Sequence, residues 1–206
     1  MRAKKQKKIT DCELLLEALK SWGGTLEYAD DTLKSDREFM LEALRIDIAR
    51  GSYPAYDYEY EPPPKYFFEY VDVALKVDRT FILEAVKQNG SALAYADDFL
   101  KADREIVLEA VKNDGSVLEY ADDVFKADRE IVLEAVKQNG SALAYADDFL
   151  KADREIVLEA VKHDERGYAI EYADNTLKAD REIVLEAVKK DGEMIIIASV
   201  NYCDPW

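Results

Sequence analysis

Carboxylates are the residues of this sequence whose type and regular spacing could serve catalysis or metal binding. Aspartate pairs and the glutamate of a Leu-Glu-Ala pattern recur along the chain, and such side chains serve as general acids, general bases and Ca²⁺ ligands. The pairs are Asp30/Asp31, Asp97/Asp98, Asp122/Asp123 and Asp147/Asp148, and the glutamates are Glu17, Glu42, Glu84, Glu109, Glu134, Glu159 and Glu186.

Neither chemistry fits the pattern. The aspartate pairs lack the D-x-D-x-D-G alternation that wraps oxygens around calcium, and these carboxylates recur repeat by repeat, whereas an active site is normally made once. The one histidine, His163, is expected at a solvated helix end. We find no Cys/His cluster with metal-ligand spacing, no phosphate loop and no G-x-S-x-G. The sequence therefore predicts no catalytic residue, no metal site and no cofactor.

The carboxylates fit helix ends and helix faces instead. Each aspartate pair is expected to cap and to form salt bridges, with Asp122 and Lys126 paired at i, i+4. The recurring glutamates are expected to form a column spaced by roughly 10 Å, one helix diameter, and partly neutralised by lysines three positions on. A solvated face and an acidic stripe for a basic partner are both open readings of this column.

The spacings arise from tandem repeats. Residues 77–101, 102–126 and 127–151 align without a gap, and residues 83–112 are identical to residues 133–162. The remaining repeats, after a basic tail at 1–9, are 10–34, 35–76, 152–178 and 179–206. This pattern predicts an all-α fold, an α-solenoid of seven short helix–turn–short-helix repeats of about 25 residues, in a single domain at 10–206.

The repeat 102–126 shows how one unit is expected to fold. Asp103 is expected to cap a helix, Gly115 to end it as a left-handed residue, and Ser116 to cap a second, shorter helix that ends near Phe125. The apolar residues of the first helix cover an arc of about 200°, which suits a helix packed between two neighbours. The counterparts of Asp103 are Asp11, Asp36, Asp78, Asp128, Asp153 and Asp180.

An arginine follows most of these capping aspartates and falls inside the apolar arc. Because a buried unpaired guanidinium is prohibitive, we expect a ladder between repeats in which arginine pairs with aspartate. The arginines are Arg37, Arg79, Arg104, Arg129, Arg154 and Arg181.

The repeat string ADREIVLEAVKQNGSALAYADDFLK closely resembles that of the family known as domain of unknown function 4116. The resemblance covers almost all of 10–198, and its D-R-E, L-E-A-V-K, N-G-S and Y-A signals recur in register. It implies a protein of short helices, similar in shape to the leucine-rich-variant solenoids, and it transfers no functional residues. The departures are Cys12 after the first capping aspartate, an insertion at 46–68 and a divergent last repeat.

Charge and hydropathy exclude several function classes. The formal net charge is −16, and the first eight residues carry five positive charges, so the remainder carries about −21. Such a field repels nucleic acid and favours a basic protein partner, or simply solubility. We see no transmembrane segment and no signal peptide, and Cys12 and Cys203 form no disulfide framework. These features predict a cytoplasmic, intracellular protein without membrane contact.

The insertion is the feature that the repeats do not explain. It is rich in aromatic residues and broken by prolines, a composition typical of recognition loops. A loop that folds back to cover the solenoid is an equal alternative. The candidate partner-binding residues are Tyr53, Tyr56, Tyr58, Tyr60, Tyr66 and Phe67.

The last repeat, 179–206, becomes more apolar where a terminal repeat normally becomes more polar. We expect residues 194–197 to be covered by the tail 201–206 or by a second copy, so the protein is a monomer or a dimer through this repeat. The leading functional hypothesis is a non-catalytic helical-repeat module for protein–protein interaction. The alternatives are a structural subunit or spacer and, third, an enzyme or calcium-dependent protein.

Overall fold

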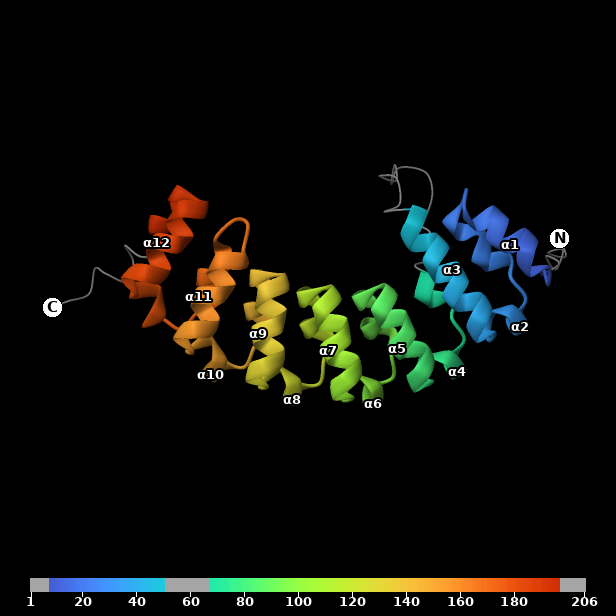
Figure 1. Cartoon of the computed structure of the whole chain (residues 1–206), viewed down its shortest axis with the longest axis horizontal. Helices are drawn as coiled ribbons and strands as arrows, with labels where there is room; N and C mark the ends of the chain where they lie inside the picture. Colours follow the sequence, from blue (N-terminus) through green and yellow to red (C-terminus); the bar gives the residue numbers. More distant parts are fainter. Residues whose placement is uncertain (1–7, 51–66, 197–206) are drawn as a thin grey trace, which may run out of the picture. The chain divides into compact units, whose positions relative to one another are not determined.

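The computed structural model describes residues 8–50 and 67–196 of the chain (Figure 1). In these residues the fold is all-α, built from repeated helical units, as predicted. They contain no named strand, and Ile9 and Ala29 form an isolated parallel bridge. The chain separates into two compact units, residues 1–97 and 98–206, and each is described by itself.

Each repeat contains a long α-helix, a 3₁₀ helix (η) and, in most repeats, a helix of four residues. Unit 1 contains α1 (Cys12–Leu19), η1 (Gly23–Tyr28), α2 (Asp31–Lys34), α3 (Arg37–Arg50), η2 (Phe67–Glu69), α4 (Val73–Lys76), α5 (Arg79–Gln88) and η3 (Gly90–Tyr95). Unit 2 contains α6 (Asp98–Lys101), α7 (Arg104–Asn113), η4 (Gly115–Tyr120), α8 (Asp123–Lys126), α9 (Arg129–Gln138), η5 (Gly140–Tyr145), α10 (Asp148–Lys151), α11 (Arg154–His163), η6 (Tyr168–Tyr172), η7 (Leu177–Ala179), α12 (Arg181–Lys190) and η8 (Gly192–Met194).

The long helices begin where the capping aspartates predict. The Asp103 carboxylate accepts hydrogen bonds from the amides of Glu105 and Ile106, which have no partner within the helix. Its counterparts cap in the same way, and each helix begins within one residue of them: Asp11, Asp36, Asp78, Asp128, Asp153 and Asp180.

The second half of the repeat differs from the single short helix that the sequence predicted. The chain turns at Ala121 and Asp122, both close to φ −60° and ψ +150°, which separates η4 from α8. Asp114, and not Ser116, caps η4: its carboxylate accepts the Ser116 amide at 2.9 Å and the Ser116 hydroxyl at 2.6 Å. The extended backbone of Asp114 lets its side chain reach two residues ahead.

In the aspartate pairs at the start of α8 and α10 the first aspartate caps the short helix and the second pairs with a lysine. Asp122 caps α8 by accepting the Val124 amide at 3.0 Å, so the Lys126 ammonium pairs with Asp123, at 3.1 Å. The prediction of an Asp122–Lys126 pair was therefore wrong by one residue. In the next repeat the Asp148 carboxylate lies 3.6 Å from the Lys151 ammonium.

Gly115 is not the left-handed residue that the sequence predicted. Within 8–50 and 67–196 a positive φ occurs at Gly167 alone, at 78°. Gly115 instead starts η4 and is buried against the next repeat, where an added Cβ would overlap the carbonyl oxygen of Ala135. A Cβ on Gly140 would likewise overlap the Ala160 carbonyl oxygen. These glycines are required because two backbones approach closely.

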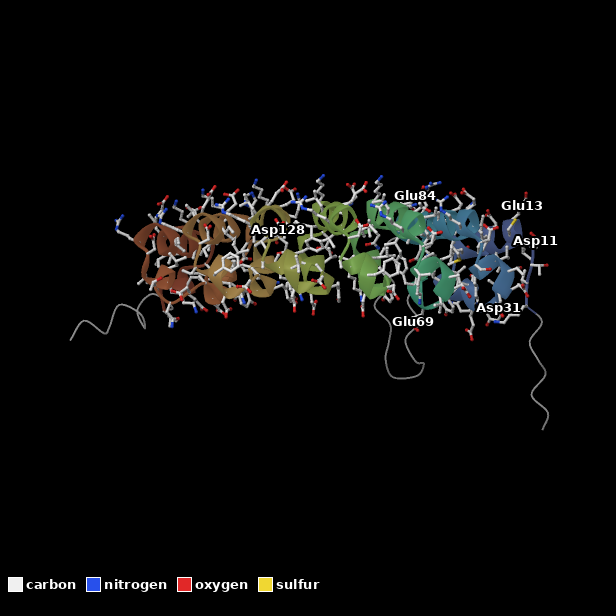
Figure 2. All side chains as sticks on the ribbon, turned by 90° about the horizontal axis from the view of Figure 1, so that it is seen from below. Asp11, Glu13, Asp31, Glu69, Glu84 and Asp128 are labelled. Carbon is white, nitrogen blue, oxygen red and sulfur yellow. The ribbon has the colours of Figure 1, made fainter. Side chains whose placement is uncertain are left out.

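Unit 2 has two layers, a layer of long helices and a layer of 3₁₀ helices. The helices α7, α9, α11 and α12 pack in chain order, and η4, η5 and η6 do the same (Figure 1). Mainly carbon side chains fill the space between the layers, and charged tips lie along the outer edges (Figure 2). In α9 the side chains of Ile131, Val132, Ala135 and Val136 are completely buried.

Backbone hydrogen bonds also join neighbouring repeats of unit 2. The amide of Asp122 donates to the Lys101 carbonyl at 3.1 Å, and that of Asp147 to the Lys126 carbonyl at 2.8 Å. In a third bond of this kind the amide of Asp174 donates to the Lys151 carbonyl at 2.9 Å. The aspartate that follows each of the 3₁₀ helices η4, η5 and η6 thus links its own repeat to the preceding one.

In the last repeat Met194 is buried, and Ile195 and Ile196 are 54% and 61% exposed. The predicted cover, 201–206, lies outside the described residues, so the covering of this repeat stays a prediction.

We predict that Gly115→Ala and Gly140→Ala each destabilise the protein. The new methyl group must displace the backbone of the next repeat, and overpacking of this kind costs about 1–3 kcal/mol. Urea unfolding followed by circular dichroism measures the loss.

Gly192→Ala is the matched control, because a Cβ there meets nothing within 4 Å. We expect its stability to change by less than about 1 kcal/mol. Equal effects at Gly115 and Gly192 would contradict the close-approach explanation.

Candidate functional site

The recurring arginines of unit 2 form the predicted ladder between repeats. The Arg154 guanidinium donates to Asp180 at 2.9 and 3.3 Å and to Glu182 at 2.5 Å, both in the next repeat. Arg129 binds Asp153 and Glu155 in the same way. The ladder includes glutamates as well as the predicted aspartates. Its arginines are about half exposed and not buried, because each guanidinium reaches the rim of the helix layer.

The ladder perturbs the acids that it joins. Hydrogen bonds from Arg154, followed by those from the amides of Ile183 and Glu182, hold the pKa of Asp180 below its ordinary value despite a contribution from burial that raises it. This ladder has a structural explanation, because each aspartate is also a helix cap.

The glutamate column is largely paired along its own helices. Glu17 lies 2.6 Å from the Lys20 ammonium, and Glu186 lies 2.7 Å from that of Lys189. Glu84 instead accepts from Arg37 of the preceding repeat, at 2.6 Å. These pairs favour the solvated, partly neutralised face over an acidic docking stripe.

The residues predicted to bind a partner fall largely outside the described chain. Tyr53, Tyr56, Tyr58, Tyr60 and Tyr66 lie there, in 51–66.

Phe67 is described and is 5% exposed. Its ring meets Phe68 edge-on at 5.2 Å, and Phe68 stacks on Tyr95 at 4.9 Å, beside a cavity of about 190 Å³. Phe67 therefore packs inside unit 1, and its role in partner binding stays a prediction. The helix α3 continues to Arg50, so the first residues of the predicted insertion are helical.

A groove of about 500 Å³ lies at the C-terminal ends of α7, α9 and α11 in unit 2. We call it the helix-end groove. Its lining comes from three successive repeats: Asn113, Asp114, Gly115, Gln138, Asn139, Ser141, His163, Asp164, Glu165, Arg166 and Tyr168. Most of these side chains are polar, and they include three carboxylates and one guanidinium.

The backbone at the helix ends explains this polarity. Each of the helices α7, α9 and α11 ends at a residue that turns the chain into an extended conformation, as at Asn139 with φ −151° and ψ 109°. The last carbonyls of a helix carry a partial negative charge. The groove is therefore favourable to hydrogen-bond donors and to positive charge.

One repeat contributes more of the groove than the others, because it is two residues longer. The added length forms the loop between α11 and η6, which turns through Gly167 in the left-handed region. Asp164 holds this loop from inside: it is 6% exposed and accepts the amides of Ala169 at 2.5 Å and Arg166 at 3.2 Å. The loop places Glu165 and Arg166 in the groove lining.

The last residues of the three helices bend back onto their own helices. The Asn113 amide group donates to the Glu109 carbonyl at 3.2 Å, and His163 Nδ1 lies 3.1 Å from the Glu159 carbonyl. Gln138 donates to the Glu134 carboxylate at 3.2 Å. The sequence predicted a helix-end position for His163, but not the groove that it lines. Two features of the sequence could have indicated the groove: the two extra residues of the repeat 152–178, and His163 where the two preceding repeats have asparagine or glutamine.

Other kinds of site find no support in the described chain. In residues 8–50 and 67–196, no three His, Cys, Asp or Glu side chains are grouped so that they could hold a metal ion. Cys12 is exposed, and Cys203 lies outside these residues. No described helix combines the length and the apolar character needed to cross a membrane.

Comparison with known proteins gives one result. The family model described as "Domain of unknown function (DUF4116)" matches residues 11–53, 65–101, 78–126, 103–151, 128–166 and 153–203. No curated protein and no solved structure matches the chain.

We predict that Asp180→Asn destabilises the protein at pH 7 and loses this effect in acid. Asparagine still caps α12 but carries no charge for Arg154. Because the folded pKa of Asp180 is lowered, its contribution is complete above the unfolded value near 3.9 and is lost as the pH falls through the folded value. Thermal unfolding should show a difference of roughly 0.5–1 kcal/mol at pH 7, since Arg154 is half exposed.

Asp191→Asn is the control, because this cap accepts the Glu193 amide at 2.9 Å. At pH 7 it should cost less stability than Asp180→Asn, because asparagine keeps this cap and no arginine of the described residues hydrogen-bonds to the Asp191 carboxylate. A difference for Asp180→Asn that stays constant down to about pH 2 would contradict the charge pairing.

Proposed function

The chain belongs to the family described as Domain of unknown function (DUF4116), and we propose that it is a non-catalytic repeat module that binds a protein partner. The proposed site is the helix-end groove of unit 2, and the proposed ligand is an extended segment of the partner.

The observation that carries this proposal is the pattern of variation around the groove. The helices α7, α9, α11 and α12 have the same nine residues, REIVLEAVK, and then end in four different residues: Asn113, Gln138, His163 and Lys190. Three of these line the groove. The packed helix bodies are uniform, whereas the groove presents a different side chain in each repeat. A surface of this kind distinguishes one ligand sequence from another.

The shape and chemistry of the groove support an extended polypeptide. Neighbouring repeats pack about 8–10 Å apart. Each repeat along the groove therefore matches more than two residues of an extended chain. Its amides, hydroxyls and carboxylates match the regularly spaced donors and acceptors of a peptide backbone. Its helix-end carbonyls favour hydrogen-bond donors, and the exposed Glu165 and Arg166 add one charge of each sign to the lining.

Three groups in the groove that are capable of catalysis already have structural partners. The Asp114 carboxylate caps η4, and the Asp164 carboxylate holds the loop before η6. His163 Nδ1 faces a carbonyl of its own helix. These contacts favour binding over catalysis as the role of the groove.

The test is the triple variant Asn113→Ala, Gln138→Ala, His163→Ala. All three side chains are exposed, so the fold should be retained. Proteins captured by the immobilised full chain from an extract of the source cells should be retained about tenfold less by this variant. Quantitative mass spectrometry measures the retention.

The matched control removes the preceding residue of each helix: Lys112→Ala, Lys137→Ala, Lys162→Ala. These side chains are also exposed, but they do not line the groove. The control should retain the same proteins as the unmodified chain. Equal retention by both triple variants would rule out the groove as the binding site.

A further inference from the structure

A second surface of unit 2 is formed by its four-residue helices. Phe99 on α6, Val124 on α8 and Phe149 on α10 occupy the same position in successive repeats and are 57%, 71% and 58% exposed. We call these three residues the short-helix row. The residue after each one is buried: Leu100, Phe125 and Leu150 are 1%, 8% and 2% exposed. Each short helix therefore buries one apolar side chain and presents another to solvent.

The fold itself does not require an apolar residue in this row. On the four-residue helix α2 of unit 1 the same position is Thr32, whose amide and hydroxyl donate to Asp30 at 3.0 and 2.9 Å. The repeat thus accommodates a polar residue that supports its own cap. Exposed large apolar side chains in three successive repeats mark an interaction surface.

The charges beside the row specify the partner. Each row residue follows an aspartate with an almost fully exposed side chain: Asp98, Asp123 and Asp148 at 98%, 95% and 100%. Each carboxylate pairs with a lysine of its own short helix, at 3.3, 3.1 and 3.6 Å. These lysines, Lys101, Lys126 and Lys151, are only 23–25% exposed, so the carboxylates are the charged groups that face solvent most fully. A second copy of this chain would place like charges together across the contact, which disfavours self-association.

We propose that the short-helix row binds a basic amphipathic helix of a protein partner. Repeats packed about 8–10 Å apart match the roughly 10.5 Å that separate every seventh residue of an α-helix. A partner helix with an apolar residue at every seventh position places one beside Phe99, one beside Val124 and one beside Phe149. Lysines or arginines on the flanks of that stripe pair with the three aspartates. This surface is separate from the helix-end groove and does not depend on it.

The probe is a fluorescein-labelled synthetic peptide of roughly 21 residues, rich in lysine and alanine, with leucine at every seventh position. The comparison peptide has the same composition, with its leucines distributed around the helix. Fluorescence anisotropy measures the dissociation constant of each peptide for the full chain. We expect the striped peptide to bind about tenfold or more tightly than the comparison peptide.

The variant is Phe99→Thr, Val124→Thr, Phe149→Thr, which copies the residue that α2 already contains at this position, Thr32. It should retain the helical circular dichroism and bind the striped peptide about tenfold more weakly. The groove variant Asn113→Ala, Gln138→Ala, His163→Ala should bind this peptide as the unmodified chain does, so the two proposals fail separately.

Equal binding of the two peptides, or unchanged binding by the threonine variant, would overturn the proposal, because charge alone would then explain the binding. Sedimentation velocity provides a further check. An unmodified chain that dimerises, with a threonine variant that is monomeric, would also overturn it and would assign the row to contact between copies.

Discussion

The close approach of a glycine to an alanine carbonyl of the next repeat is the constraint on which the rest of unit 2 depends. Because Gly115 and Gly140 have no side chain, each 3₁₀ helix starts directly against the end of the following long helix. That approach fixes the spacing of repeats, since any larger residue would separate them. Two other links need the same spacing, namely the amide of Asp147 on the Lys126 carbonyl and the guanidinium of Arg154 on Asp180. All three kinds of contact form together at the two junctions that join 102–126, 127–151 and 152–178, where Arg104 and Arg129 supply the guanidiniums. This explains why helices that are each marginal alone are stable as an array.

The sequence predicted those parts of the fold that depend on short-range interactions. The helix starts follow from aspartates that bind amides two or three residues ahead, and such contacts need no knowledge of the neighbouring repeat. The arginine ladder was also predicted, but its reason was wrong: the guanidiniums are half exposed, and they pair with acids at the start of the next long helix without being buried. The role of Gly115 was not, since the chain nearby does not reveal which backbone approaches it from the next repeat. The division of η4 from α8 was missed because Ala121 is as compatible with a helix as with a turn.

The candidate groove could be predicted from the sequence only in part. The helix-end position of His163 follows from its place after REIVLEAVK, but the side chains that it joins come from three repeats and meet only in the packed array. The extra length of one repeat was visible, whereas its effect was not, because the direction of the loop depends on the buried Asp164. The two proposed surfaces of unit 2 share a physical logic. The nine residues REIVLEAVK of the long helices are uniform, and the residues at the helix ends and on the short helices vary.

The backbone hydrogen bond from the aspartate after each 3₁₀ helix to a lysine carbonyl of the preceding repeat affects how such a chain can change its length during evolution. It needs no particular side chain on the accepting residue, and it recurs at successive junctions, as at Asp122 and Asp147. An in-frame duplication of one whole repeat would create a junction with the same donor, the same acceptor and the same glycine contact. Residues 83–112 and 133–162 are identical, as expected of a chain that has grown by copying such segments. Repeat number is thus a property that recombination can alter in a single step, while each surface acquires its differences afterwards by substitution.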